Sequence, residues 1–231
     1  MIVLLKVALV LILSYLVGSI PSGWIIVKIA SGKDVRQVES GRTGGTNAMR
    51  AAGWLAGLLT GLADVLKGVS TGLFVTWLLP GSTWLQVFAA LAAVWGHNHS
   101  IFLYERTPSG KIKLRGGAGG ATVLGGAIAL WPPILFFIAP LSGLVFLISG
   151  YASLTTISIA FFAAIIFCIR YFLGIGPWEY IVYGVLAELT VLWALRPNLK
   201  RLREGTERMV GPRANWKKKS IQKASTKQHI F

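Results

Sequence analysis

Charged residues and cysteine are scarce in this sequence, and each of these two shortages excludes a class of protein. Charged residues make up 13% of the 231 residues, about half of what soluble domains carry, so a water-soluble globule would lack the polar surface to cover itself. Apolar residues make up 54%, which excludes an intrinsically disordered chain. The lone cysteine, Cys168, excludes an intrachain disulfide framework and a cysteine-based zinc site. These shortages indicate a polytopic membrane protein.

Long stretches without a formal charge predict where the chain crosses the membrane. Residues 7–27 and 116–169 contain no Asp, Glu, Lys or Arg, and about 20 apolar residues are enough for one helical span. Gly18, Pro21 and Gly23 predict a bend or a re-entrant turn in the second half of the first stretch. The seven transmembrane helices of the expected all-α fold lie at about 3–20, 52–79, 83–103, 119–132, 133–149, 152–172 and 178–195.

The basic residues predict the orientation of the chain. Of the 23 Lys and Arg residues, 19 lie in three short segments, 31–50, 104–115 and 196–231. Even numbers of expected helices separate these segments, so all three lie on one side of the membrane, and the positive-inside rule makes that side cytoplasmic. An odd helix count then puts the N-terminus outside and the C-terminus in the cytoplasm. We expect a multi-pass protein of the cell membrane whose active face is cytoplasmic.

The chain is expected to form one domain over residues 1–210, followed by a mobile basic tail over 211–231. The positive charge of the tail serves either as a topology signal alone or as a contact for anionic lipid head groups. A formal net charge of +15 would suggest nucleic-acid binding in a soluble protein. Here the charges gather beside membrane helices, so no nucleic-acid partner is expected.

The first polar stretch, Ser40-Gly-Arg-Thr-Gly-Gly-Thr-Asn-Ala-Met-Arg50, has the composition of an anion-binding loop. Its glycines allow backbone N–H groups to converge on an anion. Ser40, Thr46 and Asn47 add neutral donors, and Arg50 adds a guanidinium fork that fits a phosphate. No Gly-Lys-Ser/Thr follows, so the stretch is not a Walker A loop. The alternative is an ordinary solvated loop with helix caps.

A second glycine-rich stretch, Arg115-Gly-Gly-Ala-Gly-Gly-Ala-Thr122, directly precedes an apolar helix. The free N–H groups at a helix start attract anions, although glycines also serve close helix packing in membranes. This stretch lies on the same predicted side of the membrane as the first. Together the two stretches predict a phosphate-bearing ligand held at the cytoplasmic face.

The ionisable residues near that face have structural and functional interpretations. His97 is either a structural residue at the membrane interface or a phosphate donor and proton carrier. His97 and His99 do not share a helical face and have no evident third ligand, so no metal site is expected. Asp64 and Lys67 are three residues apart in an expected membrane helix, and we expect them to neutralise each other.

These motifs, taken in order, resemble those of the bacterial acyl-phosphate:glycerol-3-phosphate acyltransferases, a family of small seven-helix membrane enzymes. The stretches that carry the resemblance are Gly18-Ser-Ile-Pro-Ser-Gly23, Ser40 to Arg50, Asp64-Val-Leu-Lys-Gly68, Gly96-His-Asn with Gly116 to Thr122, Tyr151-x-Ser-Leu-Thr-Thr-Ile157, and Asn198-Leu-Lys-Arg-Leu with Gly205-Thr-Glu207. The resemblance implies transfer of an acyl group from acyl phosphate to the 1-hydroxyl of glycerol 3-phosphate. The products would be lysophosphatidic acid, for phospholipid synthesis, and inorganic phosphate. Glycerol 3-phosphate, acyl phosphate and membrane lipid are the implied partners, and no metal or coenzyme is implied.

The polar stretches and the resemblance together predict the site. The predicted catalytic residues are Ser40, Arg50, His97 and Arg115. The predicted substrate-binding and phosphate-binding residues are Gly41, Gly44, Thr46, Asn47, Gly116, Gly117, Gly119 and Asn198. Arg50 and Arg115 are expected to clamp the phosphate groups of the two substrates. The glycerol hydroxyl is expected to attack the acyl phosphate directly, because no His–Asp relay that would make Ser40 a nucleophile is recognisable.

Four departures from the family pattern support a second interpretation. The family usually has Asn at the position of Arg42, Lys at that of Ala118 and His at that of Leu195, and the stretch 104–114 is longer than the usual connection. The second interpretation is a non-catalytic membrane protein that keeps the fold and binds phospholipid or a protein partner. Under the enzyme interpretation, one hypothesis is that Arg42 replaces the missing charge from the opposite loop.

Overall fold

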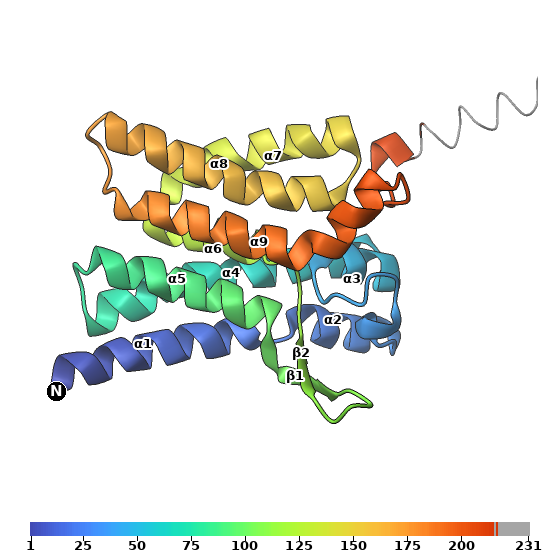
Figure 1. Cartoon of the computed structure of the whole chain (residues 1–231), viewed down its shortest axis with the longest axis horizontal. Coiled ribbons are helices and arrows are strands. Elements are labelled where there is room, and N and C mark those ends of the chain that lie inside the picture. The colour runs from blue at the N-terminus through green and yellow to red at the C-terminus, as the bar shows by residue number, and fades with distance from the viewer. Residues whose placement is uncertain (215, 217–231) are drawn as a thin grey trace, which may run out of the picture.

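The computed structural model describes residues 1–214 and residue 216, and most of them are helical (Figure 1). Of the predicted tail, 211–231, residues 215 and 217–231 therefore lie outside the described residues. The α-helices are α1 (Ile2–Ser19), α2 (Ser22–Ser31), α3 (Gly45–Ala52), α4 (Trp54–Leu78), α5 (Thr83–Asn98), α6 (Gly120–Leu130), α7 (Leu135–Ser149), α8 (Ala152–Phe172) and α9 (Glu179–Arg203). Two short 3-10 helices, η1 (Val35–Gln37) and η2 (Pro132–Ile134), and two strands, β1 (Ser100–Arg106) and β2 (Ile112–Arg115), connect them.

Five segments of the described chain are apolar and long enough to cross a membrane. They are Ile2–Ser31, Trp54–Leu78, Pro132–Ser149, Ala152–Phe172 and Glu179–Arg203. The first runs through α1 and α2, which are separated at Ile20 and Pro21. The predicted bend in residues 7–27 is therefore confirmed.

A helix lies in each of the seven ranges predicted from the sequence, and α2 and α3 are additional. Two of the seven, α5 and α6, are not among the five candidate spans; they have 16 and 11 residues, and a helix that spans a bilayer usually has about 17–25 residues. Both contribute buried side chains to the largest hydrophobic core, which they share with α8 and α9. The membrane character of the chain follows from its apolar helices, whereas seven crossings and the orientation of the termini stay predictions.

The prediction of an all-α chain is wrong at the connection between α5 and α6. The helix expected over 83–103 ends at Asn98, and the next residues form β1, which pairs antiparallel with β2. Ile101, Phe102 and Leu103 are apolar and continue the charge-free run, which is why the sequence predicts a helix as far as residue 103. Apolar β-branched and aromatic residues suit a strand equally well. The resulting hairpin projects sideways from the helix bundle (Figure 1).

Small residues set how closely the helices approach. A Cβ atom at Gly68 in α4 would overlap the backbone of Thr122 in α6, and one at Gly125 in α6 would overlap the backbone of Val65 in α4. Larger residues would force these two helices apart, as is common in membrane bundles. The close contact holds the start of α6, and with it the glycine-rich stretch, against α4.

Candidate active site

A cavity of about 360 Å³ is lined by the loop before α3, by α3 itself, by the starts of α6 and α8, and by the end of α9 and the residues after it. This volume is within the range of small-molecule sites, about 300–1,000 Å³. Four segments supply most of the lining, with residues in the ranges 40–50, 118–121, 152–159 and 195–208. The first polar stretch, the glycine-rich stretch and the end of the last helix are therefore brought together, although they are far apart in sequence.

Most of the predicted site residues line this cavity, and a minority do not. The lining includes Ser40, Gly44, Thr46, Asn47, Arg50, His97, Gly119 and Asn198. Gly41, Gly116, Gly117 and Arg115 are described by the structure but lie outside the lining. Ala118 and Leu195, two of the positions that depart from the family pattern, both line the cavity, so these departures fall at the site itself.

Asn47 organises the first polar stretch with its own side chain. Its Nδ2 lies 3.0, 2.9 and 2.9 Å from the backbone carbonyl oxygens of Val35, Val38 and Arg42, to which it donates. A buried amide that holds three carbonyl groups fixes the path of the loop between η1 and α3. The position of Arg42 in the cavity wall thus depends on Asn47.

Two arginines of this stretch face the cavity, and burial weakens the charged form of both. Burial lowers the pKa of Arg50, an effect that the carboxylate of Glu207 opposes and Arg201 reinforces. Burial and the charge of Arg201 lower the pKa of Arg42 to about 10, against the opposing effect of Glu207. Within the described chain, neither Arg42 nor Arg50 has a carboxylate at ion-pair distance.

Asp64, Lys67 and His97 form a buried polar group, of which Asp64 and His97 line the cavity. The Nζ of Lys67 lies 2.7 Å from the Oδ1 of Asp64, which confirms the predicted pairing. The Nδ1 of His97 lies 3.6 Å from the same oxygen. Asp64 thereby faces a histidine on a different helix, and Nδ1 is the ring nitrogen turned toward it. No metal-binding group of three or more His, Cys, Asp or Glu side chains occurs in the described part of the chain.

The other nitrogen of His97 is turned toward the glycine-rich stretch. A Cβ atom at Gly117 would overlap Nε2 of His97, and the backbone N–H of Gly117 donates to the His97 carbonyl over 3.0 Å. Gly116 accepts a backbone hydrogen bond of 3.3 Å from Thr43, which joins the two polar stretches directly. Gly116 and Gly117 therefore do not line the cavity but contact residues close to it, Thr43 and His97. Gly119, whose φ of 92° favours glycine, does line the cavity.

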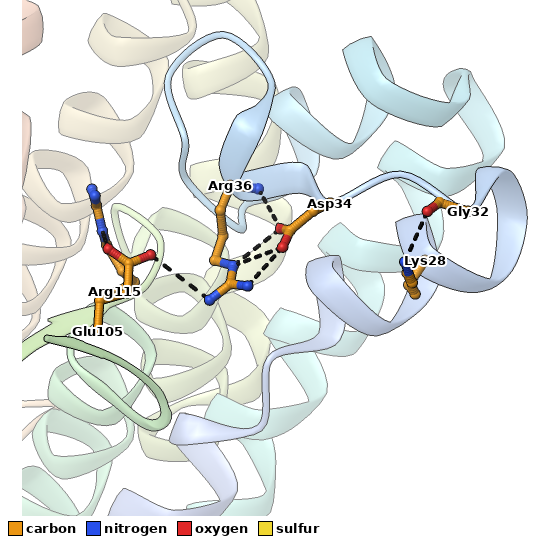
Figure 2. Close-up of polar contacts among 6 residues, drawn as sticks. All are labelled: Lys28, Gly32, Asp34, Arg36, Glu105 and Arg115. Atoms are coloured by element: carbon orange, nitrogen blue, oxygen red, sulfur yellow. Dashed lines mark hydrogen bonds and ion pairs between the residues drawn. The ribbon is translucent and has the colours of Figure 1, made fainter.

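Arg115 is drawn away from the cavity by an ion-pair network. Its Nε lies 2.7 Å from Oε2 of Glu105, which β1 contributes. The other carboxylate oxygen of Glu105 lies 3.7 Å from Arg36, and Arg36 is bonded to Asp34 over 2.6 Å (Figure 2). The sequence predicts Arg115 at the phosphate groups because its partner Glu105 is ten residues away and comes beside it only when the hairpin folds.

Glu207 is a buried carboxylate that sequence reasoning did not include in the site. Its Oε1 accepts from Asn198 over 2.8 Å and from Ser153 over 3.2 Å, while its Oε2 lies 2.8 Å from Arg201. Only 8% of its side chain is exposed. Glu207 therefore ties the start of α8 to the end of α9. The motif Gly205-Thr-Glu207 contained the signal, but its partners come from other parts of the chain.

The fold and the cavity together define an integral membrane protein with an arginine-lined cavity at one end of its helix bundle. The sequence model of the family described as "Glycerol-3-phosphate acyltransferase" matches residues 8–205. The chain belongs to this family, which confirms the resemblance seen in its motifs.

Named relatives and solved structures agree with this assignment. "Glycerol-3-phosphate acyltransferase 3" of Dehalococcoides mccartyi is 40% identical, over 90% of this chain and 98% of its own. "Glycerol-3-phosphate acyltransferase" of Rubrobacter xylanophilus is 41% identical, over 91% of this chain and 98% of its own. The crystal structure of PlsY, an integral membrane glycerol 3-phosphate acyltransferase, in its glycerol 3-phosphate form superposes with a TM-score of 0.76 at 30% identity, over 89% of this chain and 96% of that one.

Proposed function

We propose that this protein is a membrane acyltransferase that moves a fatty acyl group from acyl phosphate to the 1-hydroxyl of glycerol 3-phosphate. The product is lysophosphatidic acid, a precursor of membrane phospholipid. The family assignment supports the reaction class, and the resemblance of the motifs implies the acyl phosphate donor and the 1-hydroxyl acceptor. The site lies at the cytoplasmic face, because the three basic segments of the sequence follow the positive-inside rule.

The observation that carries this proposal is the unpaired cationic charge of the cavity. Arg50 lines it without a carboxylate at ion-pair distance in the described chain, and burial lowers its pKa. Arg50 is half-buried, and a cation withdrawn from water without a counter-charge is costly, so a bound anion offsets part of that cost. Both proposed substrates carry a phosphate group, and the guanidinium fork of Arg50 suits it.

Neutral groups beside Arg50 complete the proposed phosphate contacts. Ser40, Thr46 and Gly44 come from the same stretch, and Gly119 marks the start of α6, where free N–H groups point outward. Asn198 lines the opposite wall, and its Oδ1 is buried without a hydrogen-bond partner among the described residues. Arg115 is left out of these contacts because Glu105 pairs with it outside the lining.

The apolar part of the cavity wall suits the acyl chain. Phe146, Ile159 and Leu195 line the cavity together with the polar groups. The reacting carbonyl carbon would therefore lie where an apolar wall meets the cationic loop. Such an arrangement places donor and acceptor side by side, and the positioning itself lowers the barrier.

The chemical step needs little from the protein beyond position and charge. The hydroxyl oxygen of glycerol 3-phosphate bonds to the carbonyl carbon, and the bond between that carbon and the phosphate oxygen breaks. The hydroxyl proton passes to the departing phosphate, whose growing negative charge the Arg50 guanidinium stabilises. Within the described chain no hydrogen bond joins Ser40 to a histidine, so nothing there activates Ser40 as a nucleophile. His97, whose Nδ1 faces Asp64, shapes the cavity and assists the transfer only modestly.

Purified protein in lipid nanodiscs, supplied with acyl phosphate and glycerol 3-phosphate, tests the proposal. Lysophosphatidic acid and inorganic phosphate should form in equal amounts, and acyl-coenzyme A should not replace the donor. If no lysophosphatidic acid forms while the folded protein still binds phospholipid, the non-catalytic interpretation is correct instead.

A further inference from the structure

Arg42 reaches across the cavity from the first polar stretch to α9. Its backbone carbonyl is held by Asn47 over 2.9 Å, and its Nη2 donates to the backbone carbonyl of Ala194. The guanidinium therefore lies beside Leu195, which also lines the cavity. Arg42 thus places a cation beside Leu195, in the part of the wall that α9 supplies.

This guanidinium lacks one partner. Its Nη1 is buried, and no acceptor within the described residues receives a hydrogen bond from it. Buried polar groups in folded proteins are nearly always bonded, so an unbonded one in a cavity wall points to a missing acceptor.

The same guanidinium also lacks a counter-charge. Two charged groups affect its pKa: the positive charge of Arg201 lowers it, and the negative charge of Glu207 raises it. Glu207 already pairs with Arg201 at 2.8 Å. The negative charge of Glu207 is therefore mainly compensated by Arg201. Arg42 has no carboxylate at ion-pair distance in the described chain. An anion with oxygen acceptors meets both needs at once.

We propose that Arg42 binds a phosphate group in the cavity, as the second cation beside Arg50. The inference rests on the proposed function for the identity of the ligands, which are phosphate monoesters or acyl phosphates. Arg50 enters the cavity from α3 and Arg42 from the loop before it, so two phosphate groups can each meet a guanidinium. Ala118, on the facing glycine-rich stretch, provides no charge. Arg42 therefore takes the place in the clamp that sequence reasoning gave to Arg115.

Variants of Arg42 test the proposal, with an exposed cation of the same segment as the control. Arg42→Gln keeps polarity and bulk but removes the charge, and Arg42→Lys keeps the charge but removes the fork. Lys33→Gln removes the same charge outside the cavity, since Lys33 is exposed. Each protein is studied in nanodiscs, and its thermal unfolding is recorded first.

Two measurements follow for each variant: the KM for each substrate, and the equilibrium affinity for glycerol 3-phosphate and for inorganic phosphate. Arg42→Gln should raise the KM for at least one phosphate substrate, and weaken phosphate binding, by about tenfold or more, because a charge-assisted hydrogen bond is lost. The substrate whose KM changes identifies which phosphate Arg42 holds. Arg42→Lys should recover part of the affinity, and Lys33→Gln should match the wild type.

The proposal is overturned if folded Arg42→Gln keeps wild-type KM values and wild-type phosphate affinity. It is also overturned if Arg42→Gln and Arg42→Lys lose thermal stability equally and the folded fraction binds phosphate normally, since Arg42 then serves only to hold α9. A wild-type protein that binds phosphate but forms no product would refute the proposed function alone. The binding arm would still decide the role of Arg42 in that case.

Discussion

The guanidinium of Arg115 lies 2.7 Å from the carboxylate of Glu105, on the other strand of the β-hairpin (Figure 2), and Arg115 does not line the cavity. Glu105 also faces Arg36, so the pair joins the hairpin to the loop that precedes Ser40. A cation that sequence reasoning placed at the phosphate groups thus has a structural partner. This geometry favours a role in holding the two loops together.

Arg115→Gln and Glu105→Gln separate the two roles of this pair. The side chains of Arg115 and Glu105 are 39% and 34% exposed. Because exposed ion pairs contribute only about 0–1 kcal/mol, breaking this one should cost little stability. If the pair is structural, each variant should stay within about threefold of the wild-type kcat/KM. If Arg115 binds phosphate, Arg115→Gln should lose about ten- to a hundredfold, whereas Glu105→Gln should lose nothing.

Replacement of Glu207 by Gln should destabilise the protein. The carboxylate accepts hydrogen bonds from Asn198 and Ser153 and pairs with Arg201, and loss of a charged hydrogen-bond partner costs about 1.5–3 kcal/mol. Thermal unfolding in nanodiscs should show a lower midpoint. Glu204→Gln is the matched control, because Glu204 is 50% exposed and lies 3.8 Å from Lys200. Equal midpoints for the two variants would contradict the structural role of Glu207.

Gly117→Ala should impair both the site and its support. An added Cβ would overlap the ring of His97, and His97 is buried with Nδ1 turned toward Asp64, so the ring has to rotate away. Gly117 also donates a backbone hydrogen bond to the His97 carbonyl, so the substitution would shift the glycine-rich stretch as well as the ring. We expect a loss of at least about tenfold in kcat/KM, since small misplacements of the cavity wall are costly. Gly143→Ala in α7 serves as the control, because a Cβ there meets no atom within 4 Å. Full activity of Gly117→Ala would show that this contact is unimportant.

The pair of Asp34 and Arg36 should make stability depend on pH. The hydrogen bonds from Arg36 lower the pKa of Asp34 from 3.8 to about 2. A carboxyl group whose pKa is lowered on folding stabilises the fold fully at pH values above its pKa in the unfolded chain. This stabilisation is lost as the pH falls through its pKa in the folded protein, about 2. The difference in unfolding midpoint between the wild type and Asp34→Asn should therefore shrink as the pH is lowered from about 6 toward 2. A difference that does not change with pH would argue against the pair.

The helices were predictable because a membrane span is a local property of the sequence. Charge-free runs are long enough to be counted, and the break near Pro21 is visible as a residue without a backbone N–H. The end of α5 was missed because Ile101 and Phe102 are apolar in either a helix or a strand. Only the pairing of β1 with β2 decides between the two, and that pairing is not local.

The site was predictable where one stretch carries both the loop and its polar groups, as from Ser40 to Arg50. Asn47 is predicted to bind phosphate and does line the cavity. Its amide nitrogen, however, donates to backbone carbonyl groups of the loop. Partners that come from distant elements were missed. Glu105 for Arg115 and Ser153 for Glu207 are brought close only by the tertiary fold.

The most direct test of the account is the kcat/KM of Arg50→Ala and Arg50→Lys in the acyl phosphate assay, measured beside the wild type. Arg50 lines the cavity without a carboxylate at ion-pair distance among the described residues, and the proposed phosphate site depends on it. We predict that Arg50→Ala loses about ten- to a hundredfold or more, because charge-assisted hydrogen bonds are worth about 1.5–3 kcal/mol. Arg50→Lys should also lose activity, since a point charge does not reproduce the fork. Wild-type kcat/KM in folded Arg50→Ala would contradict the account.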